Sequence, residues 1–415
     1  MNRQILKKEY DYRGKYARNT EISRTNRWEL PMSSFFIGIL SLFFLVYAGA
    51  NYYVGLRVLQ SFRGLVDQYV LVYWSCYLLV AVLPFAARLG RTYYPGLLND
   101  WVTVISNYWL AALYYLVLSW ALVDIMRLTG RLFFPATGIN GQPSAVIGFG
   151  VLVAVSCLLA YGVWNARNPR IHHYDVTVNK SVPGLSELRA VMVSDIHLGV
   201  IVDNNRLEAM VSRINELEPD IVFLAGDTID EDVSRFVEQK MPEALGKLRS
   251  TYGVYAVMGN HEYLGGNGLL AAEYLQQAGV KVLRDSYLKV NNQFYVVGRD
   301  DRMLDRMSGK GRLELSEVMR GVDQTLPIFL LDHQPYNLAE GQQNGVDLQL
   351  SGHTHHGQFF PNNLVTERIY EVDWGYLRKG SYQAIVSCGY GTWGPPIRIG
   401  NYPEIVDIRI RFEGN

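Results

Sequence analysis

The 415-residue sequence has few cysteines and no excess of either charge. Of its three cysteines only Cys388 lies in the charged C-terminal half, so that half cannot contain an internal disulfide. Cysteine usage therefore gives no indication of an oxidising compartment. Lys plus Arg and Asp plus Glu both number 39, so the overall charge does not predict a nucleic-acid partner.

Charged residues are also absent from four apolar stretches in the N-terminal half. Each stretch approaches or exceeds the roughly 20 residues that a helix needs to cross a bilayer, and Trp and Tyr gather near several of the ends. Four buried helices of a soluble protein are the alternative, but four such runs in succession argue against it. The predicted spans of this helical transmembrane bundle, residues 34–166, are 34–54, 69–87, 101–123 and 145–164.

No ionisable side chain lies near the middle of any predicted span, although a proton relay or an ion path normally needs one. The N-terminal half is therefore predicted to be an anchor, a lipid-contacting platform or an oligomerisation surface rather than a transporter. Sequence alone leaves the oligomeric state open.

The distribution of Lys and Arg predicts the orientation of the spans. Residues 1–33 and the two regions on their side hold twelve Lys and Arg, against four in the opposite loops. The segment 1–33 is too long and too charged to be the start of a signal peptide, although "AGA" at 48–50 resembles a cleavage site. We therefore expect a multi-pass protein of the plasma membrane with a basic cytoplasmic segment 1–33 and a cytoplasmic C-terminal half.

The C-terminal half, residues 171–415, alternates apolar runs with helical patterns, which is typical of an α/β domain. Helices are expected within 204–219, 235–249 and 268–279. The main predicted strands are 173–178, 188–195, 220–227, 253–262, 326–333, 346–353 and 382–389, with shorter ones within 280–300.

Polar side chains stand where several of these strands stop. Because the carboxyl ends of the strands form the ligand crevice of an open α/β sheet, we expect these side chains to converge. Their oxygen and nitrogen atoms suit zinc, iron or manganese, and about seven ligands can hold two ions that share one carboxylate. Taken singly, a strand-end Asp or Asn is more often a turn former, and a lone His is more often structural. The strand-end residues are Asp195, Asp227, Asn260, His333 and His353, with His197 and His355 just beyond.

Five short motifs carry a resemblance to a known family. They read "DIH" (195–197), "GD" (226–227), "GNHE" (259–262), "LDHQP" around His333, and "GHTH" (352–355). In this order they resemble the signature of the calcineurin-like metallophosphoesterases, and the resemblance extends over residues 188–412. "GHTHHGQ" together with "PPIR" and "PEIV" resembles the membrane-associated branch of that family.

The resemblance implies layered β-sheets flanked by helices and two divalent ions, Mn, Zn or Fe, in each chain. One ion would be held by Asp195, His197 and His355, and the other by Asn260, His333 and His353. Asp227 would bridge the ions, a hydroxide between them would attack phosphorus, and His261 would be the catalytic acid or charge stabiliser.

Other residues near these motifs have two interpretations each. Arg398 could grip a phosphate or form a structural ion pair, and it is open whether His356 points into the site. Glu262 could support the ligands or lie on the surface. Gly226, Gly259 and Gly352 each precede a ligand, and we expect them to allow the positive φ of a sharp turn.

The combined prediction is a membrane-anchored two-metal phosphoesterase acting on a phosphodiester or pyrophosphate, with a lipid headgroup as the expected substrate. Only about seven residues, "ARNPRIH", separate the last span from the first strand, a reach of about 25 Å at most. The domain would thus be held at the bilayer surface. Two alternatives remain, a soluble nucleotide or small phosphoester with the spans as anchor only, and a catalytically silent phosphate-binding module.

Overall fold

The computed structural model describes residues 34–94, 96–133, 143–266, 268–304 and 311–414. The predicted basic segment 1–33 lies outside the described residues. The chain divides into two compact units, Met1–Val58 and Leu59–Asn415. The first contains most of helix α2 (Ser34–Ser61), and the second contains every other described element, including those of the C-terminal half.

Among the described residues, four helices are long and apolar enough to cross a membrane, as the four uncharged runs predict. Together with a C-terminal α/β domain they confirm the predicted fold class. The four candidate spans are Gly38–Ser61, Arg63–Ala81, Leu97–Phe133 and Ala145–Ala166.

The apolar run 69–87 is not a single helix. Helix α4 (Val70–Ala81) ends before Val82, and helix α5 (Leu83–Tyr93) starts there with Pro84 in its first turn. Proline has no N–H to donate to the preceding turn, so it starts a helix more readily than it continues one. The charged residues of α5 therefore belong to a separate short helix.

The apolar run 101–123 lies inside the longer helix α6 (Leu97–Phe133), which has 37 residues. At 1.5 Å per residue such a helix is about 55 Å long, well beyond the roughly 30 Å of a bilayer core. Asn99, Thr103 and Ser106 are buried in its first turns. Since only part of α6 is needed to cross a bilayer, its N-terminal turns are free to pack against the C-terminal half.

The described residues of the C-terminal half form two six-stranded sheets. The first has the order β1-β12-β2-β3-β4-β5, and the second has the order β10-β11-β9-β8-β7-β6. The first sheet consists of β1 (Arg170–Val178), β2 (Glu187–Val193), β3 (Ile221–Ala225), β4 (Gly253–Val257), β5 (Lys281–Val282) and β12 (Glu404–Phe412). The second consists of β6 (Ser286–Val290), β7 (Phe294–Gly298), β8 (Ile328–Leu331), β9 (Leu348–Ser351), β10 (Gly375–Lys379) and β11 (Tyr382–Val386).

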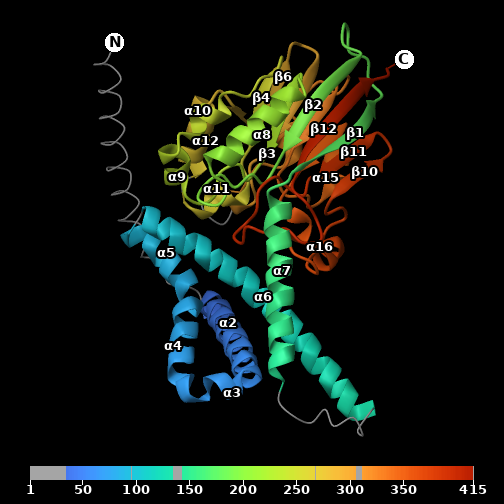
Figure 1. Cartoon of the computed structure of the whole chain (residues 1–415). Coiled ribbons are helices and arrows are strands. Elements are labelled where there is room, and N and C mark those ends of the chain that lie inside the picture. The colour runs from blue at the N-terminus through green and yellow to red at the C-terminus, as the bar shows by residue number, and fades with distance from the viewer. Residues whose placement is uncertain (1–33, 95, 134–142, 267, 305–310, 415) are drawn as a thin grey trace, which may run out of the picture. The chain divides into compact units, whose positions relative to one another are not determined.

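Strand β3 shows how the sheets form layers. Phe223 points into a core that it shares with Phe329 of the second sheet, whereas its neighbours Val222 and Leu224 point into a core shared with the helices. Because successive side chains of a strand face opposite sides, this five-residue buried strand contributes to both cores. The two sheets therefore pack face to face with helices outside them (Figure 1).

Short helices cover the outer faces of both sheets. Those over the first sheet are α8 (Asn204–Glu216), α9 (Val233–Glu238), α10 (Met241–Leu245), α11 (Asn260–Leu264) and α12 (Gly268–Gln277). The second sheet carries α14 (Leu315–Val318) and α15 (Leu338–Gln343), and α16 (Asn363–Ile369) follows β9.

The sequence patterns predict most of these strands but miss β10 and β12. Strand β12 lies between β1 and β2, parallel to the first and antiparallel to the second. It comes from the end of the chain, whereas β1 directly follows helix α7 (Ala145–Ala166), as Figure 1 shows. The last strand thus joins β1, the edge strand that follows the apolar helices, to β2 of the first sheet.

Candidate metal centre

The candidate ligands stand at the ends of strands from both sheets. Asp195 and His197 follow β2, Asp227 follows β3, and His353 follows β9. Five candidate ligands have left-handed backbones, which non-glycine residues rarely adopt and which cost about 1–3 kcal/mol each. Such strain persists only where the surrounding fold enforces it. The five are Asp195 (φ 50°), His197 (φ 53°), Asp227 (φ 50°), His353 (φ 73°) and His355 (φ 48°).

The three motif glycines are needed for two different reasons. Gly226 has a φ of +89°, as expected for a sharp turn. Gly259 has an ordinary φ of −107°, and a Cβ there would lie 2.1 Å from Asp227 Oδ1. A Cβ on Gly352 would lie 2.2 Å from Asp195 Oδ2. The prediction of positive φ is thus wrong for Gly259 and Gly352, which are glycine because a carboxylate needs the space.

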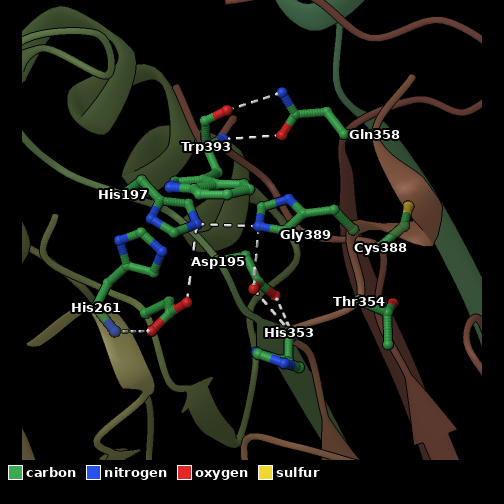
Figure 2. Close-up of polar contacts among 12 residues, drawn as sticks. Asp195, His197, His261, His353, Thr354, Gln358, Cys388, Gly389 and Trp393 are labelled. Atoms are coloured by element: carbon green, nitrogen blue, oxygen red, sulfur yellow. Dashed lines mark hydrogen bonds and ion pairs between the residues drawn. The ribbon is translucent and has the colours of Figure 1, made fainter. Parts of the chain in front are cut away.

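The first group of candidate ligands is Asp195, His197 and His355, all buried. The Nε2 atoms of His197 and His355 face each other at 3.0 Å, and Asp195 Oδ1 lies 3.4 Å from His355 Nε2. The backbone N–H of His353 donates to Asp195, which fixes that carboxylate (Figure 2). The three donor atoms therefore converge from the ends of β2 and β9.

The second group is Asp227, His333 and His353. Asp227 Oδ2 lies 3.1 Å from His333 Nε2, and Asn260 Oδ1 lies 2.8 Å from His353 Nδ1. Asn260 thus joins the group, as the sequence predicts, from the start of α11.

A single carboxylate oxygen faces both groups. Asp227 Oδ2 is 3.1 Å from His333 in the second group and 3.9 Å from His197 in the first. The other oxygen, Oδ1, accepts a hydrogen bond from the backbone N–H of His261 at 2.8 Å. Asp227 therefore has the position that a carboxylate shared by two ions requires.

The tautomer of His333, as well as the positions of the ligand atoms, suits a divalent ion. His333 Nδ1 donates to the carbonyl of Ala225 at 2.8 Å, so Nε2 is the atom that remains for a metal. This buried Nε2 faces the carboxylate of Asp227, whose Oδ2 lies 3.1 Å away. Backbone carbonyls commonly orient metal-binding histidines in this way. The donor set of imidazole nitrogens, carboxylates and one amide oxygen suits Zn, Fe or Mn.

Electrostatics favour the ligand forms of most of these groups. Burial lowers the pKa of His197 to about 4 and that of His353 to about 3, so both rings are neutral near pH 7. Burial opposes the charge on Asp227, but His333 and His261 hold the pKa of this carboxyl well below its usual range. Burial likewise opposes a charge on His333, yet Asp227 raises its pKa well above the usual value. A bound ion would therefore displace a proton from His333.

Comparison with known proteins agrees with this geometry. Residues 188–357 match the family model described as calcineurin-like phosphoesterase. An uncharacterized metallophosphoesterase of Aquifex aeolicus is 36% identical over 250 residues, which cover 59% of this chain and 93% of that protein. The chain belongs to the calcineurin-like metallophosphoesterases.

One further relative is named as a transmembrane protein, and another is similar over more of this chain. A Danio rerio "transmembrane protein with metallophosphoesterase domain" is 34% identical over 273 residues, covering 63% of this chain and 62% of that protein. The chain thus spans less than two thirds of that relative. An uncharacterized metallophosphoesterase of Campylobacter jejuni is 26% identical over 377 residues, or 88% of this chain and 96% of that protein.

His261 lies at the centre of the metallophosphoesterase site. Its ring meets the ring of His197 edge to face, with ring centroids 4.5 Å apart (Figure 2). Its Nδ1 lies 3.1 Å from Asp230 Oδ1. Burial opposes a positive charge there, but Asp227 and Asp230 raise the pKa of His261 to about 9. The side chain is therefore a cation that can meet a phosphate oxygen.

Asp230 is a site residue that the sequence analysis misses. It belongs to a third group with His197 and His261, and its Oδ1 lies 3.9 Å from His197 Nδ1. His261 and His197 in turn hold the pKa of Asp230 at about 2 against the effect of burial. The signal was present in "GDTID", where a second Asp follows Asp227 by three residues within the same strand-end loop.

Glu262 supports the ligands rather than lying on the surface. It is 1% exposed and accepts hydrogen bonds from the backbone N–H of Gly259 at 2.8 Å and of Ile229 at 2.9 Å. It therefore joins the loop after β3 to the loop after β4.

Both candidate substrate residues, Arg398 and His356, have partners within the protein. Arg398 is 0% exposed and donates to the carbonyls of Gly389 and Gly391. His356 Nδ1 is 2.8 Å from Asp373 Oδ2, and its ring packs on Trp374. Because its guanidinium N–H groups donate to backbone carbonyls, Arg398 has no free pair of N–H groups for a phosphate. The structure therefore favours a structural role for Arg398.

Arg398 acts together with Gln358 on one loop, residues 389–395. Gln358 Oε1 accepts from the backbone N–H of Trp393, and its Nε2 donates to the carbonyls of Trp393 and Pro395 (Figure 2). Trp393 then lies against His261, with ring centroids 5.8 Å apart. The final Gln of "GHTHHGQ" thus positions the aromatic side chain beside the predicted catalytic histidine.

Proposed function

We propose that this metallophosphoesterase hydrolyses a phosphodiester or pyrophosphate in the headgroup of a membrane lipid, using two divalent ions. The position of Asp227 Oδ2 between His333 and His197 carries the two-ion part of this proposal. In it, Asp195, His197 and His355 hold one ion, and Asn260, His333 and His353 hold the other. The "GHTHHGQ" motif supports assignment to a membrane-associated branch of the family.

Two bound ions would activate water as a nucleophile and neutralise charge on phosphoryl oxygens. The protein's own part is positioning and charge. His261, held by Asp230, presents a cation to the phosphate and can give its proton to the leaving oxygen. Glu262 and the Ala225 carbonyl keep the ligands oriented without touching the substrate.

The proposal of a lipid substrate rests on an exposed apolar surface of the catalytic domain, in addition to the apolar helices. Helix α16 has no buried residues, and it exposes Leu364 (43%), Val365 (56%) and Ile369 (58%), with Phe360 (51%) just before it. Tyr115 of the candidate span α6 donates to the Phe360 carbonyl at 2.9 Å. An apolar surface that is joined to a membrane helix is suited to dip into the lipid interface.

The end of α7 holds the catalytic domain more firmly than a short tether would. Asn165 is 3% exposed, and its amide donates to the carbonyls of Arg398 at 3.0 Å and Asn401 at 2.6 Å. This docking supports an active site fixed near the bilayer. We extend the proposal to a membrane region 34–166 and a catalytic domain 171–415 that faces the cytoplasm at the plasma membrane.

The test compares lipid and soluble substrates with the full chain in mixed micelles. A lipid phosphodiester and a lipid pyrophosphate are assayed beside their water-soluble headgroup analogues and a nucleotide. We expect kcat/KM to be at least about tenfold higher for one lipid than for its analogue. Equal efficiency on the soluble nucleotide would contradict the lipid proposal and leave the helices as an anchor. A protein that binds two ions but turns over no phosphoester would be a silent binding module.

Orientation is tested separately with tags at Met1 and Asn415. We expect both tags to resist an impermeant label in intact cells and to react after lysis, because the Lys and Arg bias predicts cytoplasmic termini. A periplasmic or extracellular reporter of known topology serves as the positive control. Labelling of the Asn415 tag in intact cells would mean that the enzyme faces outward.

A further inference from the structure

Arg302 lies at the same edge of the second sheet as the metal ligand His333. It follows the last residue of β7, Gly298, by four positions, and His333 follows the last residue of β8, Leu331, by two. The two strands are parallel neighbours. Because parallel strands end at the same edge of a sheet, the loops after β7 and β8 lie beside each other. Arg302 therefore belongs to the edge at which the metal centre is built.

Hydrogen bonds hold the loop of Arg302 to the loop of His333. Gln334, the residue after His333, donates from Nε2 to both carboxylate oxygens of Asp301, at 3.0 Å and 2.9 Å. Asp301 is 1% exposed and also accepts from the backbone N–H of Met303 at 2.8 Å. The backbone on both sides of Arg302 is thus fixed next to a candidate metal ligand.

Three arginines close to Arg302 in the sequence are each paired with a carboxylate. The pairs are Arg284 with Asp300 at 2.8 Å, Arg299 with Glu340 at 2.7 Å and Arg312 with Asp332 at 2.8 Å. Arg302 makes no ion pair within the described residues, although Asp300 and Asp301 directly precede it. Those two carboxylates are engaged by Arg284 and Gln334, so the charge of Arg302 is left for another partner.

The ring of Tyr336 supports the side chain of Arg302. The guanidinium carbon lies 5.5 Å from the centroid of this ring, which is within the range of a cation–π contact. Nε is buried and has no hydrogen-bond partner in the described part of the chain, whereas the two terminal nitrogens are not buried. The side chain as a whole is partly exposed. The guanidinium is therefore positioned by the ring, and its outer N–H groups can donate to a ligand.

Tyr336 and Tyr370 connect Arg302 to the second group of metal ligands. The ring centroid of His353 lies 6.3 Å from that of each tyrosine, and the two tyrosine rings are 4.8 Å apart. The two hydroxyls lie 2.9 Å apart in an exposed hydrogen bond. One hydrogen bond uses only one of their two O–H groups, so the other can donate. His353, the tyrosine pair and Arg302 thus form a continuous row of side chains.

Tyr370 also joins this row to the exposed apolar surface of α16. It is the residue directly after that helix, and its neighbour Ile369 is 58% exposed. The apolar surface and the row of donors are therefore adjacent. A lipid whose acyl chains lay against α16 would have its headgroup beside the tyrosine pair and the metal centre.

The donors of the row suit a second anionic group on the substrate. A guanidinium binds a phosphate through paired N–H groups, and such charge-assisted hydrogen bonds are stronger than neutral ones. A phosphodiester carries a single charge, which the two ions and His261 would meet at the metal centre. A pyrophosphate carries another phosphate directly next to the scissile one. The free cation beyond His353 therefore favours a pyrophosphate.

We infer that Arg302, together with the hydroxyl pair of Tyr336 and Tyr370, binds a second phosphate of the substrate next to the one at the metal centre. The inference rests on the proposed function and narrows it from a phosphodiester or pyrophosphate to a pyrophosphate. Hydrolysis of such a substrate consumes one water and gives two phosphate monoesters, so no further co-reactant is required. Arg302 is then the residue that distinguishes the two substrate classes.

The experiment compares two variants of Arg302 in the full chain. Arg302→Met keeps an unbranched side chain that can pack on Tyr336 and removes the charge, whereas Arg302→Lys keeps the charge and loses the paired N–H groups. Arg320→Met, at an exposed position after α14, is the matched control. The substrates are symmetrical bis(p-nitrophenyl) pyrophosphate and bis(p-nitrophenyl) phosphate, which differ by one phosphate. Cytidine diphosphate diacylglycerol in mixed micelles and cytidine diphosphate glycerol compare a lipid pyrophosphate with a soluble one.

Binding is measured apart from turnover, by calorimetry of the full chain in detergent. The ligands are the symmetrical dimethyl ester of methylenebisphosphonate, whose P–C–P bridge resists hydrolysis, and methyl methylphosphonate, which has one phosphorus. We expect the wild type to bind the first at least about tenfold more tightly than the second, and Arg302→Met to lose this difference.

Turnover should show the same dependence on Arg302. Arg302→Met should lower kcat/KM on the pyrophosphate by about tenfold or more and leave the phosphodiester within about threefold, because the metal centre is unchanged. Arg302→Lys should lose less than Arg302→Met, and Arg320→Met should match the wild type. The phosphodiester also reports whether each variant is folded.

Three results would overturn the inference. They are equal binding of the two phosphonates by the wild type, an equal loss on pyrophosphate and phosphodiester in Arg302→Met, and wild-type turnover of the phosphodiester alone. The proposed function fails in other ways. Arg302-dependent binding without any turnover would indicate a silent phosphate-binding module and would support the second-phosphate site. Equal efficiency on the soluble and lipid pyrophosphates, with the Arg302 dependence intact, would contradict the lipid proposal alone.

Discussion

The metal centre and the α6 polar face are both polar clusters beside one cavity of the protein, but they are built differently. The metal centre comes from strand-end loops of the catalytic half, and nearly every side chain in it has a hydrogen-bonding partner or could bind one of the two ions. The α6 polar face, formed by Asn99, Thr103, Ser106 and Asn107, lies on a helix, and the buried Thr103 hydroxyl has no hydrogen-bond partner among the described residues. All the candidate metal ligands come from the catalytic half. The cavity beside them is lined in part by residues of helices α5 and α6.

The largest effect is expected at the carboxylate that both ligand groups share. Asp227→Ala should abolish detectable turnover, a loss of at least about a thousandfold, because it removes an oxygen from each ion's ligands. Metal analysis of the purified variant should show both ions lost. Retention of two ions per chain would mean that Asp227 does not bridge them, and circular dichroism checks that the variant is folded.

His261 separates metal binding from catalysis within the centre. His261→Ala should keep both ions and lose turnover by about a hundredfold or more, since the side chain supplies charge and a proton but no bond to a metal. The measurement is kcat beside metal content, with Glu262→Gln as a neighbouring control whose defect should be mainly in stability. Loss of metal in His261→Ala would place this residue among the ligands.

The junction between the two halves is expected to give a moderate effect on stability. Asn165→Ala removes two buried hydrogen bonds to the carbonyls of Arg398 and Asn401, and should cost about 1–3 kcal/mol. Thermal unfolding of the full chain in detergent measures this as a lower Tm. An unchanged Tm would show that the end of α7 is not docked on the catalytic domain as described. Asn168→Ala, three residues further along the chain at an exposed position just beyond α7, is the control.

The smallest effect is expected at the exposed part of the contact between α5 and the catalytic half. Arg88 pairs with Glu231 at 2.5 Å, but its side chain is 67% exposed. Solvent screening limits such a pair to no more than about 1 kcal/mol, so Arg88→Ala should leave kcat/KM within about threefold. Raising the salt concentration should reduce the difference from the wild type further. A large loss would show that this exposed ion pair contributes directly to activity.

Much of the metal centre could be predicted from sequence because its residues lie at strand ends. The strands are short, buried and apolar, so their ends are visible as the first polar residue, and parallel strands bring such ends to one edge. All seven candidate ligands and His261 are brought together in the structure. Asp230 was missed because a second Asp in a strand-end loop is indistinguishable from a turn residue until His261 is seen beside it.

The sequence by itself determined the periodic features of this protein, namely the apolar runs, the alternation of strands and helices, and the polar residues that end them. Tertiary structure alone decided what depends on segments far apart in the chain. In the folded protein Arg398 points inward and donates to the 389–395 loop. The lack of a side chain at Gly259 leaves space for the carboxylate of Asp227. Thr103 and Trp393, far apart in the sequence, line the same cavity. Periodicity reports which side of an element is apolar, whereas a contact between distant segments follows from close packing of the whole domain.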